Sequence, residues 1–233
     1  MRQLHLTRFE MNFLFDLSPI VCTISSCGVP VPAMARPCNP FHSLIESVGK
    51  EVTEMPDMEK LGKLAEDFGF TAWGDLDMNT LEFKQEVRDM CKVNTCGQWD
   101  RTWACPPACG TLEEMRERVE KYHCGFLVQT VGLMEDSFDI ETMMETAANH
   151  KKNFDTLWDV LKKEYPGLMA MGTGGCNRCA KCTYPDAPCR FPDKLCASME
   201  GCGLVVNEVC TANGLKYNHG KDTICYTGCF LLE

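Results

Sequence analysis

The sequence lacks the features that mark nucleic-acid-binding, membrane-spanning and secreted proteins. Lys and Arg number 23 against 33 Asp and Glu, so the net charge is −10 and no basic patch for phosphates is visible. No apolar run reaches the length of a membrane span, and Glu10 and Asp16 interrupt the apolar stretch that a secretory signal needs. We therefore expect a cytoplasmic protein with neither a nucleic-acid nor a membrane partner.

The common enzyme fingerprints are missing too. The sequence contains no P-loop, no dinucleotide-binding glycine pattern and no nucleophile elbow. Residues 172–175 are rich in glycine, but they lead into Cys176 rather than into a phosphate-binding helix. None of the five histidines stands at ligand spacing with another. These absences leave cysteine as the residue type that carries the chemistry.

Cysteine is unusually abundant, with 17 among 233 residues. Disulfide frameworks are typical of short secreted chains with an even cysteine count and an export signal. This chain is long, its cysteine count is odd, and the compartment we expect is reducing. The cysteines are therefore predicted to be thiolate ligands of metals.

The sequence divides into two regions. Residues 1–54 include a proline-rich stretch at 30–40 and sustain no amphipathic period, which predicts a loosely structured N-terminal extension. An arm packed on the core is the alternative for this segment. Residues 55–233 are predicted to form a cysteine-rich, metal-binding iron–sulfur domain.

Helix and strand patterns alternate along the second region. Strands are predicted at 70–73, 124–134, 167–171 and 223–232. Helices are predicted at 57–68, from a capping box at Asn79 and Glu82 to Cys91, from a second box at Thr111 and Glu114 to Val119, at 140–161, near 198–201 and at 205–213. This alternation predicts an α/β fold, with a mixed sheet flanked by helices and cysteine-rich metal-binding loops.

The main motif is Cys176-x2-Cys179-x2-Cys182, with Cys189 after six intervening residues. It is close to the bacterial ferredoxin pattern C-x2-C-x2-C-x3-C-P, from which it differs in its longer last gap and later proline. Zinc sites are usually built from two separated C-x2-C pairs instead. These four cysteines are predicted to hold a [4Fe–4S] cluster, with zinc as the alternative.

A second group of thiols precedes the main motif. Cys91, Cys96, Cys105 and Cys109 lie within 19 residues, most of them beside glycine or proline, where irregular backbone lets thiolates turn inward. A second [4Fe–4S] cluster is expected here. Cys109 is the leading fourth ligand and Cys229 is the alternative. If only three cysteines bind, one iron stays open to a substrate.

Several motifs in order resemble a family of uncharacterised predicted metal-binding proteins, the domain of unknown function 2284. The resemblance runs from about 58 to 232. The pieces that carry it are the Cys91/Cys96 pair, residues 103–107 (WACPP), 175–192, 198–203, 215–218 and 226–229. The resemblance implies a bound metal but indicates no substrate or reaction. Proteins of this family are typical of anaerobes.

Three functions compete on these observations. The first is electron transfer, or a cluster-bearing accessory role in anaerobic metabolism, with a redox partner protein. The second is an enzyme that binds a small molecule at an open iron. The third is a structural zinc protein whose metals hold loops together.

Overall fold

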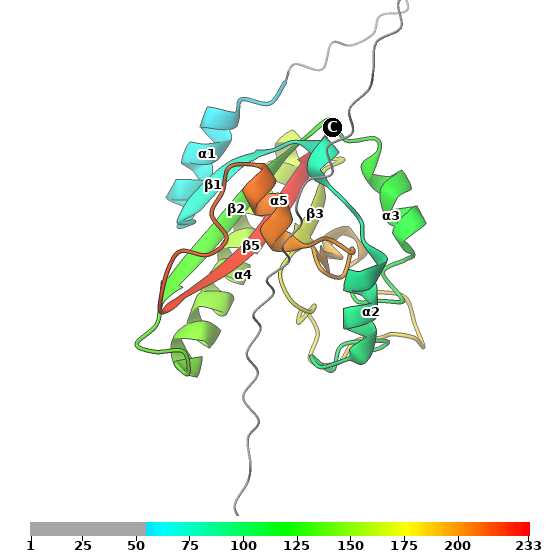
Figure 1. Cartoon of the computed structure of the whole chain (residues 1–233). Coiled ribbons are helices and arrows are strands. Elements are labelled where there is room, and N and C mark those ends of the chain that lie inside the picture. Colours follow the sequence, from blue (N-terminus) through cyan, green and yellow to red (C-terminus); the bar gives the residue numbers. More distant parts are fainter. Residues whose placement is uncertain (1–54) are drawn as a thin grey trace, which may run out of the picture. The chain divides into compact units, whose positions relative to one another are not determined.

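The structure is a computed structural model that describes residues 55–233. These residues form a mixed five-stranded sheet with five α-helices, which confirms the predicted α/β class (Figure 1). The prediction for residues 1–54 lies outside the described residues. Within the described part of the chain, no helix is both long and apolar enough to cross a membrane.

The central strand of the sheet is the last of the five strands along the sequence. Its strands, in spatial order, are β1 (Ala72–Leu76), β2 (Cys124–Leu133), β5 (Thr223–Leu232), β3 (Met169–Gly172) and β4 (Ala197–Ser198). β2 and β5 are antiparallel, from the pair Cys124 and Leu232 to the pair Leu133 and Thr223. β3 is antiparallel to β5 and parallel to the short edge strand β4.

Helices cover both faces of the sheet. The helices are α1 (Met58–Asp67), α2 (Gln85–Val93), α3 (Leu112–Val119), α4 (Ile140–Glu164) and α5 (Val206–Ala212). Alternate residues of β2 point to opposite faces, so Phe126 and Val128 pack with α1 and α4 whereas Leu127 packs with α3 and α5. Figure 1 shows α5 in front of the sheet and α4 behind it.

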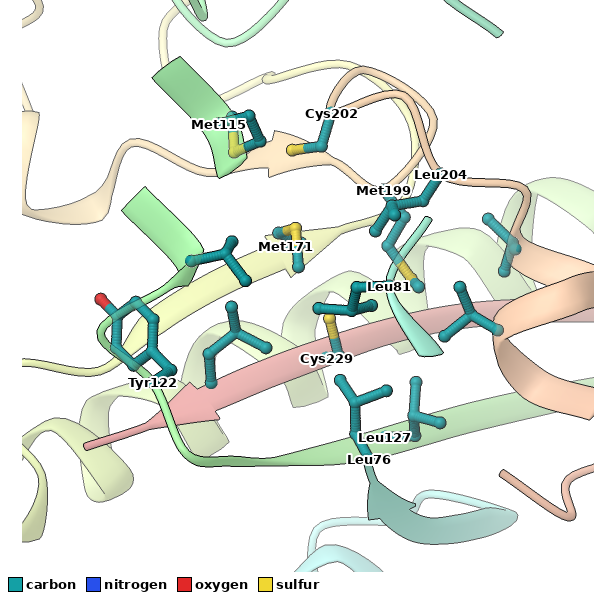
Figure 2. Close-up of a cluster of buried hydrophobic side chains, with 14 of the residues drawn as sticks. Leu76, Leu81, Met115, Tyr122, Leu127, Met171, Met199, Cys202, Leu204 and Cys229 are labelled. Atoms are coloured by element: carbon teal, nitrogen blue, oxygen red, sulfur yellow. The ribbon is translucent and has the colours of Figure 1, made fainter. Parts of the chain in front are cut away.

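The face under α3 and α5 is rich in sulfur. Met115, Met171 and Met199 pack there with Cys202 and Cys229, all of them at most 1% exposed (Figure 2). Methionine and unionised cysteine behave as adaptable apolar groups in such a core. This half of the core supports the turn at residues 199–204, which borders one of the cysteine-lined cavities described below.

Two predicted helix starts have different outcomes. The capping box at Thr111 and Glu114 is confirmed, because each side chain accepts a hydrogen bond from the other residue's backbone N–H, at 3.2 and 2.7 Å. The box at Asn79 and Glu82 is wrong. Asp77 accepts from the backbone and side chain of Asn79 and caps a 3-10 turn, and α2 starts only at Gln85.

The predicted helix near 198–201 is also wrong. Ala197 and Ser198 form β4 beside β3, and the chain then turns, with the Cys202 N–H donating to the Ser198 carbonyl. The strand depends on a partner far away in the sequence, so local pattern did not reveal it.

Candidate metal centre

The four cysteines of the main motif line one cavity of about 370 Å³. Cys176, Cys179, Cys182 and Cys189 are each half-buried in it, on the loop that follows β3. Gly174 enters this loop with a φ of 64°, a left-handed conformation that favours glycine. The loop thus places all four cysteines of the motif in the lining of one cavity.

Helix α4 anchors this loop through Arg178, which lies between the first two cysteines. Arg178 Nη2 lies 2.5 Å from Asp155 Oδ1, and its Nε donates to the Lys194 carbonyl at 2.9 Å. The guanidinium also lies 5.6 Å from the centroid of the Trp158 ring, a cation–π distance. Lys194 continues the anchor by pairing with Asp159. Two successive turns of α4 therefore hold the main-motif loop.

Further hydrogen bonds hold residues 181–190 of the loop, one of them within the loop and one from Trp103 outside it. Arg190 Nη1 donates to the Lys181 carbonyl at 2.9 Å, and Trp103 Nε1 donates to the Ala187 carbonyl at 3.0 Å. The Phe191 N–H lies 3.4 Å from Cys189 Sγ. Backbone N–H groups that donate to sulfur stabilise a thiolate and tune a bound metal.

The charged side chains that line this cavity are all basic. They are Arg101, Arg178, Lys181, Arg190 and Lys194. No Asp or Glu of the described residues is among its lining residues. In a chain with a net charge of −10, this local excess of positive charge favours anions, including thiolates and the anionic centres that they form with metals.

Cys91, Cys96 and Cys105 line a second cavity, of about 310 Å³. Cys91 lies in the last turn of α2, which ends at Asn94 with a φ of 60°. Trp99 lies in the wall of this cavity, as do the glycines of residues 174–175. The three cysteines come from the end of α2 and from the irregular chain that follows it, yet they line one cavity.

The two candidates for the fourth ligand do not line the second cavity. Cys109 is buried, and its thiol lies 3.5 Å from the Gly201 carbonyl oxygen, beside the cavity wall. Cys229 is fully buried among apolar side chains, where burial raises the pKa of its thiol strongly (Figure 2). The fourth ligand of this site stays a prediction.

Burial also raises the pKa of the thiols of Cys91, Cys105 and Cys109. The positive charge of Arg88 opposes this effect at Cys91 and at Cys109. Because a metal binds the thiolate, loading of this site must release protons.

The two cavities are neighbours. Gln98 lines both, and the backbone N–H of Cys176 acts on the Cys105 thiol, where it opposes the rise in pKa that burial causes. A Cβ on Gly175 would lie 3.1 Å from Gln98 Cγ, so the two loops are in close contact. The main motif and the second group of thiols thus share a wall.

The second cavity is also lined by Gln98, Ser198 and Glu200, which were not among the predicted site residues, although residues 198–203 are one of the pieces that carry the family resemblance. No spacing rule links them to the cysteines, because the fold brings residues 198–200 next to α2. Within residues 55–233, no three Cys, His, Asp or Glu side chains form a group that could hold a single metal ion.

A sheet that carries two neighbouring cysteine-lined cavities is the architecture of a candidate metal-binding protein. The family model described as predicted metal-binding protein (DUF2284) matches residues 74–232, and the chain belongs to this family. The match spans both cavities. No curated protein and no solved structure matches the chain significantly.

Proposed function

We propose that this protein is an iron–sulfur electron carrier, with a [4Fe–4S] cluster at Cys176, Cys179, Cys182 and Cys189. The observation that carries the proposal is the single cavity lined by all four cysteines of a ferredoxin-like motif, with basic side chains around it. Such a cluster supplies reversible one-electron chemistry. The residues of this chain fix the thiols, exclude carboxylates from the lining and offset negative charge.

The spacing of the thiols favours a cluster over zinc. One zinc ion needs its sulfurs at about 2.3 Å, gathered tightly around a single point. A cubane places each thiolate on a different iron, so its ligands stand farther apart. Along the sequence, the C-x2-C-x2-C run with Cys189 after it resembles the ferredoxin ligand set, whereas zinc sites are usually built from two separated C-x2-C pairs.

The charge of the cavity suggests the kind of redox partner. Arg101, Lys181 and Arg190 line it without an acidic ion-pair partner among residues 55–233. An acidic carrier protein complements this rim, and electrostatic attraction of this kind speeds association at low salt. We therefore propose electron exchange with an acidic protein at this cavity.

The direct test is metal analysis of protein purified without oxygen. We expect brown protein with acid-labile sulfide, and we expect Cys179→Ser to remove about four irons per chain. Cys225→Ser is the matched control, because Cys225 lines neither cavity. Stoichiometric zinc without sulfide would refute the iron assignment.

A cluster-dependent enzyme is the second candidate. It is favoured by the second cavity, which three cysteines line while Cys109 and Cys229 do not. Single serine substitutions with iron counting decide between the two. If Cys91→Ser, Cys96→Ser and Cys105→Ser lose iron while Cys109→Ser and Cys229→Ser keep it, one iron of the cluster has no protein ligand. That result would favour the enzyme over the electron carrier. If Cys109→Ser also loses iron, the site is closed and electron transfer stands.

A further inference from the structure

One buried positive charge beside the second cavity has no carboxylate partner among residues 55–233. Arg88 lies on α2, one helical turn before Cys91, and is only 7% exposed. Its Nη2 donates to the Gly110 carbonyl at 2.9 Å. Its Nε is buried without a hydrogen-bond partner among the described residues. Within the same residues, no carboxylate oxygen lies within 4.0 Å of the guanidinium.

Such an arrangement is unfavourable unless an anion is present. An arginine keeps its charge at every physiological pH, so it cannot escape burial by losing a proton. A buried charge without a partner is strongly destabilising, whereas the same charge beside a well-placed anion is tolerated. The position of Arg88 therefore indicates that an anion belongs next to it.

The groups around Arg88 narrow the identity of that anion. Cys91 follows it on the same face of α2, and Cys109 precedes Gly110, the residue whose carbonyl Arg88 binds. The two thiols lie 3.9 and 3.5 Å from the consecutive carbonyl oxygens of Glu200 and Gly201, so both face the same turn. Glu200 is among the residues that line the cavity, and within residues 55–233 its carboxylate forms no ion pair with Arg88.

We propose that Arg88 is the buried counter-charge of an anionic metal–thiolate centre at the second cavity. This inference rests on the proposed metal site there. In the metal-free protein the buried guanidinium has no carboxylate partner among the described residues. When metal replaces the thiol protons, the sulfurs become anionic and Arg88 stabilises them. Arg88 is thus a positioning residue that links metal retention to a single positive charge.

The test compares Arg88→Met with Arg88→Lys in the full chain, reconstituted with iron and sulfide without oxygen. We expect Arg88→Met to weaken metal retention at the second site by about 10- to 100-fold, the usual effect of losing a group that supports metal ligands. Arg88→Lys keeps the charge and should restore most of it. Arg116→Met is the matched control, because Arg116 also donates to a backbone carbonyl but lies on the surface.

Thermal unfolding separates this role from a merely structural one. Without metal, Arg88→Met should melt at the same temperature as the wild type or higher, because it removes an uncompensated charge. With metal, it should melt lower. Lower melting in both states, or no rescue by Arg88→Lys, would overturn the counter-charge role while leaving the metal site intact. If Cys91→Ser and Cys105→Ser leave the metal content unchanged, no metal is bound at the second cavity and the counter-charge role of Arg88 is overturned, whereas the cluster proposed at the main motif stands.

Discussion

At the residue scale, His150 is a buried base beneath the main-motif loop. It is 1% exposed, its Nδ1 lies 2.9 Å from Thr130 Oγ1, and its Nε2 has no partner among the described residues. Burial lowers the pKa of its imidazole from 6.5 to about 4, and the positive charge of Lys151 adds to the effect. The other charged side chains of the small cavity beside it are Asp155, Arg178 and Lys194.

The low pKa of His150 predicts that acid lowers the free energy of unfolding. The unfolded chain takes up a proton at His150 below pH 6.5, whereas the folded chain does so only near pH 4. The contribution of His150 to the free energy of unfolding is therefore fully present above pH 6.5. It falls by on the order of 3 kcal/mol as the pH drops toward 4. Urea unfolding between pH 4 and 7 measures this slope. His150→Gln should flatten it, whereas His123→Gln, at an exposed position, should not.

Short spacings singled out the seven cysteines that line the two cavities, because metal-binding thiols recur at such spacings, but Cys109 lines neither cavity and metal binding by these cysteines stays a prediction. The sequence did not reveal Arg88 or Glu200. An arginine on an amphipathic helix has the pattern of a solvated residue, and Glu200 reaches the second cavity only because β4 and the following turn pack beside α2. Residues that act through the fold leave no local signal.

At the scale of single elements, the start of α3 fixes the chain just after Cys109. We predict that Thr111→Ala lowers the free energy of unfolding by about 1 kcal/mol, because it removes the side-chain half of a formed capping box. Chemical denaturation measures the loss. Thr156→Ala, which removes a hydroxyl from the interior of α4, is the control and should change little. An equal loss in both variants would contradict the capping explanation.

Helix α4 is expected to control metal retention at the main motif. Asp155→Asn removes the charge that pairs with Arg178 and loosens the Cys176–Cys179 turn. We predict about 10-fold faster loss of iron to a chelator from the first site, with the second site unchanged. Asp89→Asn, on α2, is the control. Equal rates of iron loss in wild type and Asp155→Asn would show that the ion pair does not support the site.

Local signals predicted some elements and misled at others. The box at Thr111 was predictable because both of its hydrogen bonds lie within four residues. The box at Asn79 failed because Asp77, two residues earlier, competes for the same N–H groups. β4 was missed because its partner strand lies more than 20 residues away.

At the scale of the whole molecule, the α/β class followed from alternating patterns, but the strand order did not. β2 and β5 pair across about 90 residues of chain, and no local preference encodes such a partnership. The neighbouring position of the two cavities depends on this long-range pairing and was likewise beyond sequence reasoning.

The boundary predicted near residue 55 can be tested on the whole molecule. We predict that a chain of residues 55–233 folds cooperatively and keeps its full metal content, since the seven cysteines that line the two cavities and the whole family match lie within it. Circular dichroism melting and metal analysis, compared with the full chain, measure this. Loss of either property would show that residues 1–54 take part in the working protein.

The central place of β5 has a consequence for biosynthesis. β5 lies between β2 and β3, yet the ribosome makes it after every cysteine of both cavities. Until β5 leaves the ribosomal exit tunnel, no strand pairing among the described residues joins the pair β1–β2 to the pair β3–β4. The cysteines of both cavities therefore leave the ribosome before the sheet can be completed. We therefore predict that metal loading of the two candidate sites follows translation of β5.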